Sequence, residues 1–200
     1  MSLNNVLVTG SKGFVGRHLS KRLKKSGFQV VTTDSKRRHV DVNNVEPLRT
    51  IENVKAIVHL AAKTSASDSF KEPYETYFTN VLGTLNVLEF ARIRNIKRFI
   101  YVSTYVYGQP HYLPIDEKHD LNPHSPYNIS KLIAERICQN YSQQFNIDIL
   151  SLRPFCVYGP DSRNRSLIPS VINQLKRDGI IKLSGKKSKG TFFLLLILWI

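Results

Sequence analysis

The sequence predicts an α/β fold built on a doubly wound parallel sheet. Short apolar runs rich in β-branched residues alternate with stretches of helical periodicity, which is the pattern of βαβ units. A glycine-rich turn stands between the first apolar run and the first helical stretch. At 200 residues, the chain can bury one complete core and the beginning of a second domain.

This alternation predicts five strands and three helices. Ser125 is the expected N-cap of the third helix, with Pro126 at its first helical position. Gly, Pro and Asp cluster in residues 156–165, so we expect a domain over residues 1–160 and only the start of a second one over residues 161–200. The expected strands are residues 6–9, 29–33, 56–61, 98–103 and 148–152, and the expected helices are residues 14–25, 73–92 and 126–144.

The chain is strongly basic, with a formal net charge of +14. Such a surface attracts nucleic acid, anionic lipid or an anionic small substrate. The basic runs at residues 21–25 and 35–39 are not interleaved with the aromatic side chains that stack on bases. In the first run the basic residues alternate with Leu19 and Leu23, as on the solvated face of an amphipathic helix. We therefore expect no nucleic-acid partner.

Signals for a compartment are few. The N-terminus has no basic stretch followed by a long apolar one, as a secretory signal would have. The apolar run at residues 191–200 is about half as long as a membrane span. The two cysteines, Cys138 and Cys156, have neither metal-ligand spacing nor the pattern of a disulfide framework. These features predict a cytoplasmic protein without a membrane partner or a metal site.

The glycine-rich turn has the spacing G-x-x-G-x-x-G. Gly10, Gly13 and Gly16 follow the first strand and lead into a helix, and Asp34 closes the second strand. Glycines permit a tight turn and let the main chain approach a pyrophosphate at the helix N-terminus. The Asp34 carboxylate would bond the adenosine ribose and repel the extra phosphate of NADP, whereas residues 36–38 are basic and could accept it. The turn predicts a dinucleotide cofactor, with NAD favoured.

Tyr127 and Lys131 lie four residues apart on the helix expected after Ser125, so they share one of its faces. A tyrosine that lines the core beside a lysine that reaches water would show the same spacing. The alternative is an acid/base tyrosine, whose phenol pKa of about 10 is lowered toward neutrality by the lysine ammonium. The pair alone does not decide between the two hypotheses.

With further motifs, these residues give the chain a resemblance to the extended short-chain dehydrogenase/reductases, and among them to the NAD-dependent sugar epimerase/dehydratase family, in its 4-epimerase-like branch. The resemblance covers residues 4–185. The motifs that carry it are "TGSKGFVG" at 9–16, Asp41-Val42, "HLAA" at 59–62, Asn80 in "TNVLGTLNVLE", "VSTYVYG" at 102–108, the pair at 127 and 131, and "RPFCVYGP" at 153–160.

The resemblance implies an NAD(P)-binding Rossmann fold, NAD as the cofactor and a catalytic triad. Tyr127 would take the proton of the substrate hydroxyl, Lys131 would stabilise its phenolate and bind the nicotinamide ribose, and Ser103 would orient the substrate oxygen. Taken alone, His59 and Asn80 can also be interpreted as a buried histidine and a core amide. The implied cofactor-binding residues are Gly10, Gly13, Phe14, Val15, Gly16, Asp34, Asp41, Val42, Leu60, Ala61, Ala62, Asn80, Tyr127, Lys131 and Pro154.

Two departures from the family pattern bear on the reaction. Dehydrating relatives carry Asp-Glu where this chain has Thr104 and Tyr105, so the pair that eliminates water is absent. Epimerisation needs no further acid, because the hydride taken from C4 returns to the other face of the keto-sugar. We therefore expect a 4-epimerase acting on a nucleotide-diphosphate sugar. Cys156 replaces the asparagine with which many relatives bind the diphosphate, so the family alone implies this substrate.

Three alternatives stay open. The first is a nucleotide-sugar reductase or dehydratase. The second is a non-catalytic NAD-binding protein, such as a redox-sensing regulator. The third, a nucleic-acid-binding module, rests on the charge alone. The resemblance also implies a homodimer that packs through two helices, one of them the helix that carries Tyr127.

The last residues differ from the family. Relatives continue from a similar "IKLSG" into an Arg-Asp pair, an aromatic-rich strand and a substrate domain, whereas this chain has Lys189-Gly190 and then the apolar run 191–200. The run lacks the alternation of a half-buried strand, so we expect a truncated or frame-shifted end rather than a short buried strand or a partner-docking tail. Such a chain would hold NAD but bind and turn over a nucleotide sugar poorly.

We predict that the chain binds NAD(H) more tightly than NADP(H), because the Asp34 carboxylate bonds the ribose and repels a 2′-phosphate. Titrating the protein with each cofactor measures the two affinities. A preference for NADP(H) would show that Arg37 or Arg38 sets the choice.

Overall fold

Five parallel strands form the central sheet, in the order β2-β1-β5-β6-β7. The structure is a computed structural model that describes residues 5–35, 38–39, 41–162, 167–182 and 192–194. From the first strand the chain adds one neighbour on one side and the remaining strands on the other, so the sheet is doubly wound and the predicted fold class is confirmed. The strands are β1 (Asn5–Thr9), β2 (Gln29–Thr32), β5 (Ala56–His59), β6 (Arg98–Val102) and β7 (Asp148–Leu152).

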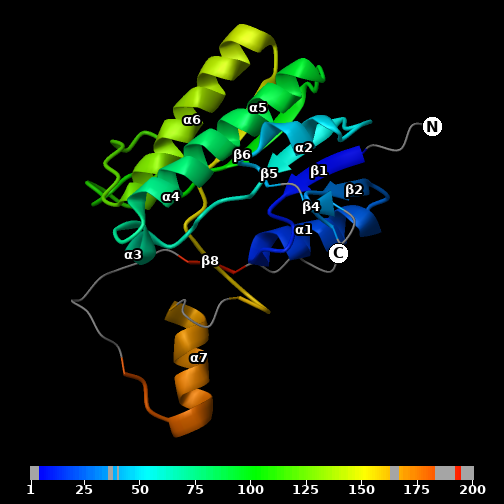
Figure 1. The fold of residues 1–200 in the computed structure, drawn as a ribbon. Helices are drawn as coiled ribbons and strands as arrows, with labels where there is room; N and C mark the ends of the chain where they lie inside the picture. Colours follow the sequence, from blue (N-terminus) through cyan, green and yellow to red (C-terminus); the bar gives the residue numbers. More distant parts are fainter. Residues whose placement is uncertain (1–4, 36–37, 40, 163–166, 183–191, 195–200) are drawn as a thin grey trace. The chain divides into compact units, whose positions relative to one another are not determined.

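Helices cover both faces of this sheet (Figure 1). Their bounds are α1 (Phe14–Lys25), α2 (Val45–Arg49), α5 (Gly83–Ile93) and α6 (Pro126–Phe145). The apolar side of α1 packs on one face, with Leu19 and Leu23 against Val8. The other three helices cover the opposite face, where the larger apolar cluster buries Leu7 and Phe99. The helical pattern of the sequence thus places a core on each side of the sheet.

The segment expected as one helix over residues 73–92 is helical throughout, but it contains a wide turn. It consists of α4 (Pro73–Tyr77), the π-helical segment η1 (Phe78–Leu82) and α5, and it follows the short helix α3 (Ala66–Ser69). The Thr84 hydroxyl donates to the main-chain carbonyl of Asn80 at 2.6 Å. A side chain inserted among the helical hydrogen bonds favours such a local widening, which apolar periodicity does not reveal.

The first turn of α6 is capped by two serines. Ser125 is the N-cap, as predicted, and its Oγ accepts from the main-chain N–H of Asn128 at 3.1 Å. Ser69, at the end of α3, accepts from the N–H of Tyr127 at 3.1 Å. Pro126 has no N–H to satisfy. The hydrogen bond from Ser69 therefore fixes the position of Tyr127 in the first turn of α6. The sequence pattern alone did not predict this hydrogen bond.

The chain divides into two compact units, Met1–Arg153 and Pro154–Ile200. The second contains α7 (Leu167–Asp178) and the strands β8 (Cys156–Tyr158) and β9 (Phe192–Leu194), which pair in parallel. A strand at 192–194 was not expected, because the side chains there do not alternate; the main-chain groups of β8 supply the pairing instead. The rest of the predicted aberrant tail lies outside the described residues.

A buried ion pair ties the end of the first unit to α6. Glu135 is 1% exposed, and its Oε1 accepts from Arg153 Nη2 at 2.5 Å. The Nε of Arg153 donates to both carboxylate oxygens at 3.1 Å, and its Nη1 donates to the hydroxyl of Tyr107 at 2.9 Å. The guanidinium is therefore bound on several sides, as a buried charge requires.

Replacing Arg153 by methionine keeps most of the side-chain volume but leaves the Glu135 carboxylate buried without its cation. We expect the free energy of unfolding to fall by about 3–5 kcal/mol. Arg49→Met is the control, since it breaks a pair with Glu46 in which the side chains are 50% and 69% exposed; its cost should stay below about 1 kcal/mol. Urea unfolding measures both, and equal losses would contradict a structural role for the buried pair.

Candidate active site at the carboxyl ends of the strands

Two rows of side chains cross the sheet beneath α5 and α6. Register pairs the residues of β1, β5, β6 and β7 directly, so each row lies on one face of the sheet. The row nearer the middle of the strands is apolar and consists of Leu7, Ile57, Phe99 and Ile149. The next row on this face, at the carboxyl ends, is polar and consists of Thr9, His59, Tyr101 and Ser151. Ligands of open α/β sheets bind at this end, so the change from apolar to polar marks the candidate site.

The loops that follow β1 and β5 touch each other at Gly10. This residue has a φ of +65°, and a Cβ on it would lie 2.8 Å from the main-chain nitrogen of Ala61. A Cβ on Gly16 would lie 2.2 Å from the carbonyl oxygen of Gly10. Only glycine fits at either position, so the tight turn requires both of them, and the approach of this turn to a pyrophosphate stays a prediction. The strand order reverses between β1 and β5, so this contact sits at the switch point of the sheet.

The start of α1 differs from the start of α6 in its capping. The N-cap of α1 is Gly13, no side chain caps the helix, and its first turn has no acidic residue. Phe14 and Val15 form that first turn and are half-buried. An uncapped N-terminus presents free N–H groups and the positive end of the helix dipole to a phosphate. The local structure therefore fits the dinucleotide turn that the sequence predicts.

A chain of hydrogen bonds starts at Thr9 and orders the site. The Oγ1 of Thr9 accepts from the N–H groups of Leu60 and Ala61, each at 3.1 Å, so its own proton points to His59 Nδ1 at 2.8 Å. His59 is fully buried, and its Nε2 must then carry the proton and donate to Thr84 Oγ1 at 3.0 Å. Thr84 passes its proton to the carbonyl of Asn80. The buried structural histidine that was one interpretation of His59 is what the structure describes.

Asn80 connects this chain of hydrogen bonds to α6. Its side chain is fully buried, accepts from the N–H of Lys63 at 2.8 Å, and donates to the Lys63 carbonyl at 3.0 Å. It also donates to Ser130 Oγ at 2.9 Å, and Ser130 donates to the carbonyl of Tyr127 at 2.7 Å. All the hydrogen-bonding capacity that the amide nitrogen has is used within the protein. Asn80 thus has the contacts of a core amide, and its predicted role beside the cofactor stays a prediction.

Ser103 and Tyr127 lie where β6 ends and α6 begins. Ser103 is 4% exposed, and its N–H donates to the carbonyl of Leu152 at 2.7 Å. Among the residues that the structure describes, its Oγ has no hydrogen-bond partner. Thr104, the neighbour of Ser103, acts on the Tyr127 phenol through a side-chain hydrogen bond that lowers its pKa. A buried hydroxyl without a partner is costly unless a ligand supplies one, so Ser103 fits the role of a substrate contact.

Thr104 is a site residue that the sequence reasoning missed. In the sequence, Thr104 stands out only as the replacement for the aspartate of dehydrating relatives. In the structure, its side chain lowers the pKa of the Tyr127 phenol through a hydrogen bond. Its position directly after Ser103, at the carboxyl end of β6, was the signal that could have found it.

Lys131 is 2% exposed, and its ammonium lies over the ring of Tyr101, with Nζ 4.3 Å from the ring centroid. Burial lowers the pKa of this lysine to about 7, against the opposing influence of Cys138 and Glu135. Burial also raises the pKa of Tyr127, with the bond from Thr104 acting in the other direction. The expected lowering of the tyrosine pKa by the lysine is therefore wrong for the protein alone, because the loss of hydration on burial raises the pKa of the phenol.

Four further residues that the resemblance assigns to the cofactor, Asp41, Val42, Ala62 and Pro154, lie in different parts of the fold. Asp41 Oδ1 accepts from the N–H of Asn43 at 3.0 Å, so it closes a turn. Val42 is 5% exposed, packs beside Gly83, and its carbonyl accepts from Asn86 at 2.9 Å. Ala62 is half-buried after the loop that touches Gly10, and Pro154 begins the second unit.

Asp34 begins the two-residue strand β3 (Asp34–Ser35), which pairs antiparallel with β4 (Arg38–His39), just after β2. The backbone therefore brings Asp34 to the carboxyl end of the second strand, as predicted. The side chain of Asp34 and residues 36–37 lie outside the described parts of the chain. The preference for NAD over NADP stays a prediction.

Residues 6–191 match the model of the NAD dependent epimerase/dehydratase family. The chain belongs to this family. A UDP-glucose 4-epimerase of Rhizobium meliloti is 31% identical, over 82% of this chain and 55% of that protein. The crystal structure of UDP-glucose 4-epimerase from Thermotoga maritima with UDP-glucose has a TM-score of 0.81 at 26% identity, over 86% of this chain and 63% of that one. The Brucella ovis UDP-glucose 4-epimerase in complex with NAD has a TM-score of 0.73 at 33% identity, over 79% and 54%.

The chain spans about half the length of the curated relatives that it matches. Membership of the NAD dependent epimerase/dehydratase family makes NAD the cofactor. The site fits this cofactor on two counts: the positive φ and close approach at Gly10, and the uncapped first turn of α1. Among the described residues, no cluster of His, Cys, Asp and Glu could hold a metal ion.

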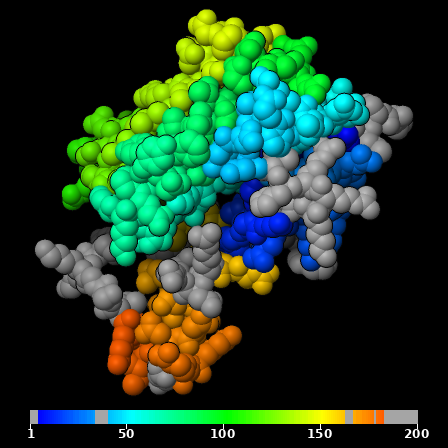
Figure 2. Space-filling model, viewed as in Figure 1, coloured from blue at the N-terminus to red at the C-terminus, as the bar shows by residue number. Residues whose placement is uncertain are grey.

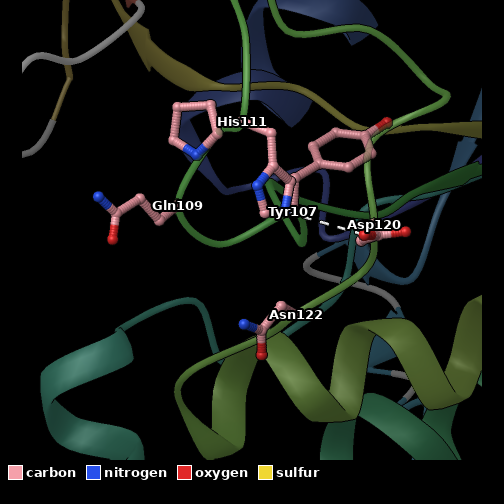
Figure 3. A pocket seen from close by; sticks show the side chains of 6 residues that line it. Tyr107, Gln109, His111, Asp120 and Asn122 are labelled. Atoms are coloured by element: carbon pink, nitrogen blue, oxygen red, sulfur yellow. Dashed lines mark ion pairs between the residues drawn. The ribbon is translucent and has the colours of Figure 1, made fainter.

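A separate hollow lies in the loop between β6 and α6. It has a volume of about 720 Å³ and is lined by Tyr107, Gln109, Pro110, His111, Asp120 and Asn122. Figure 3 shows the His111–Asp120 pair, 3.8 Å apart, on one side of it. Most of the lining side chains are polar, and they come from a loop without periodicity. No pattern in the sequence therefore predicted the hollow. None of the predicted site residues lines it.

His59 should make the protein sensitive to acid. Burial, and then the charge of Lys131, lower its pKa to about 3 from 6.5. Between these two pH values His59 is protonated in the unfolded chain but neutral in the folded chain. The free energy of unfolding therefore decreases as the pH falls through this window. His59→Gln should lose less stability between about pH 7 and about pH 4 than the parent does, by on the order of 3 kcal/mol.

Chemical denaturation at each pH measures this difference. His111→Gln is the control, because its side chain is 73% exposed, and it should follow the parent. If His59→Gln also followed the parent, the buried neutral state of His59 would be refuted.

Proposed function

We propose that this protein is an NAD-dependent 4-epimerase that acts on a nucleotide-diphosphate sugar. One observation carries the proposal: the buried hydroxyl of Ser103, at the end of β6, is unpartnered among the described residues. Its neighbour Thr104 acts on the phenol of Tyr127, and Lys131 lies one helical turn after Tyr127. Two hydroxyls at the carboxyl ends of the strands suit a substrate alcohol that must lose its proton. The solved 4-epimerases similar to this chain support the same reaction.

Each residue has a distinct task in this proposal. The glycine turn and the first turn of α1 hold the pyrophosphate of NAD, and the Asp34 carboxylate bonds the adenosine ribose. Bound NAD supplies an acceptor that takes a hydride from C4 of the sugar and gives it back. Ser103 holds the C4 oxygen, and Tyr127 takes the hydroxyl proton and later returns it. Lys131 binds the nicotinamide ribose and, while charged, stabilises the phenolate of Tyr127.

The residues after Ser103 favour epimerisation over dehydration. Thr104 has no ionisable group, and the Tyr105 hydroxyl donates to the carbonyl of Gly108. Elimination of water needs an acid and a base at these positions, whereas epimerisation needs neither. The relatives also include a dTDP-D-glucose 4,6-dehydratase of Dictyostelium discoideum and a GDP-6-deoxy-D-mannose reductase of Pseudomonas aeruginosa. A reductase is therefore the second candidate, and it would give net oxidation of cofactor instead of an epimeric product.

Incubating the chain with NAD and a set of nucleotide sugars, and separating epimers by chromatography, tests the reaction. Epimeric product without net change in NADH supports the proposal. Because the chain is expected to turn over a nucleotide sugar poorly, single-turnover formation of NADH is the second readout. Bound NAD without any NADH formed from a saturating nucleotide sugar would favour the non-catalytic alternative.

We further propose a homodimer that packs through α4, α5 and α6, whose outer surfaces form one continuous face (Figure 2). Each of these helices has an exposed large apolar side chain: Tyr74 on α4 by 72%, Ile93 on α5 by 48% and Ile133 on α6 by 40%. An apolar face of this kind is typical of a protein–protein interface. A second copy of the chain is its proposed occupant.

No helix in the described part of the chain has the length and apolar character needed to cross a bilayer. The proposal includes a cytoplasmic location and no nucleic-acid partner. Cell fractionation tests the first. Binding to random duplex DNA that persists at high salt would contradict the second.

Tyr127→Phe should abolish hydride transfer while leaving the affinity for NAD within about threefold, since it deletes one hydroxyl and little volume. Lys131→Met should harm both, because the ammonium serves the cofactor and the phenolate. Single-turnover NADH formation and NAD titration measure the two effects. Near-normal turnover by Tyr127→Phe, in a form of the protein that is active, would make the catalytic assignment wrong.

Ile133→Glu should convert the proposed dimer to a monomer, because it replaces an exposed apolar side chain of α6 by a carboxylate that the interface would bury. Sedimentation of the parent and the variant measures their masses. Leu150→Glu is the control, since Leu150 is 55% exposed on β7, away from this face. A parent that sediments as a monomer would end the dimer proposal.

A further inference from the structure

Tyr101 contacts Lys131 at both ends of the lysine. Its hydroxyl donates to the main-chain carbonyl of Lys131 at 3.1 Å. Its ring lies beneath the ammonium, with 4.3 Å from the ring centroid to Nζ. A lysine side chain has four rotatable bonds, so the ring contact restricts the ammonium end, while the hydroxyl bond holds the main chain of α6 beside the same ring.

Tyr101 is itself held from its other side. It is fully buried in the polar row, and its ring stacks on His59 in the neighbouring strand, with centroids 6.1 Å apart and planes at 25°. Hydrogen bonds to Thr9 and Thr84 fix the ring of His59. The position of Lys131 is thereby connected, through two aromatic rings, to the strand that leads into the glycine turn.

We propose that Tyr101 is a positioning residue for Lys131, and that the face of its ring holds the lysine ammonium at the site. The inference rests on the proposed function, because it assumes that Lys131 serves the cofactor ribose and the phenolate of Tyr127. It adds a residue outside the predicted triad. Tyr101 touches neither the substrate nor the reacting atoms in this assignment and acts through Lys131.

The ring matters because the lysine forms no ion pair with any carboxylate in the described part of the chain. Two groups on α6 face it: Glu135, which is bound by Arg153, and Cys138, whose pKa is raised to about 12 by burial. His59 faces it from β5 and is neutral, with a pKa lowered to about 3 by burial.

The remaining titratable groups are the phenols of Tyr101 and Tyr127, and burial raises the pKa of each. None of these groups therefore presents a free negative charge to the ammonium at neutral pH. The negative face of an aromatic ring attracts a desolvated cation most strongly in this situation.

The test measures the charge of Lys131 without cofactor. Protein labelled with ¹³C at lysine Cε is titrated by NMR, and Lys131→Met identifies the signal. The parent should titrate near pH 7. Tyr101→Phe keeps the ring and should keep this midpoint. Replacing Tyr101 by pentafluorophenylalanine keeps the shape but reverses the ring quadrupole, so the charged lysine is less stable and the midpoint should fall by about one pKa unit.

Two leucine substitutions separate positioning from packing. Tyr101→Leu should also lower the midpoint, whereas Phe99→Leu, two residues earlier on the same strand and equally buried, should leave it unchanged while opening a similar cavity. If Tyr101→Leu does not fold, the fluorinated variant still decides. An unchanged midpoint in the fluorinated protein would overturn the proposal.

A second readout ties the effect to the cofactor. If charged Lys131 binds the ribose, the NAD affinity of the fluorinated protein should fall about tenfold near pH 8 and recover at about pH 5, where the lysine is charged in both proteins. A purely structural defect would weaken binding equally at both values and would overturn the positioning role. The two proposals can fail separately. If the NMR midpoint shifts in the fluorinated protein but Lys131→Met binds NAD as tightly as the parent, the proposed role of Lys131 in cofactor binding is wrong, whereas the effect of the Tyr101 ring on Lys131 is supported.

Discussion

The close contact between the loops after β1 and β5 is the constraint on which the site depends. A Cβ at Gly10 would meet the main chain of Ala61 at 2.8 Å, so the two loops lie as near as two backbones can. Only at this separation can the Thr9 hydroxyl accept from both Leu60 and Ala61. That double acceptance directs the proton of Thr9 to His59 and so determines the tautomer of the histidine. One glycine thus sets the geometry of the turn and the polarity of the hydrogen bonds behind it.

Burial determines the charges in the region that these hydrogen bonds enclose. His59 and Lys131 are both disfavoured as cations, and Tyr127 is disfavoured as an anion, for the same reason: each loses hydration on folding. The protein alone therefore holds the candidate site close to electrical neutrality. A cofactor or substrate that brings charge would meet groups whose protonation responds to it, which suits a reaction that moves a proton and a hydride together.

The two helix starts at this edge of the sheet are built for opposite purposes. Ser69 and Ser125 accept hydrogen bonds from the N–H groups of Tyr127 and Asn128 in the first turn of α6. These N–H groups are therefore not available to a ligand. The first turn of α1 has Gly13 as its N-cap and no side-chain cap. A negatively charged group is therefore attracted to α1 and not to α6. This difference separates the place for a phosphate from the place for the acid/base residue.

The sequence by itself determined the parallel α/β sheet, the three main helices, the glycine turn and the Ser125 cap, because these depend on local periodicity and on residues with unusual backbone or capping properties. The family resemblance also predicted a triad of Ser103, at the end of β6, with Tyr127 and Lys131, in the first turns of α6. Tertiary structure alone decided that Ser69 caps α6, that η1 is a π-turn, that Thr104 contacts Tyr127, and that Tyr101 lies under Lys131. Those contacts join residues far apart in the chain or depend on a single hydrogen bond. The direction of the Tyr127 pKa shift was decided there too, because hydration is lost only when the chain has packed around the phenol.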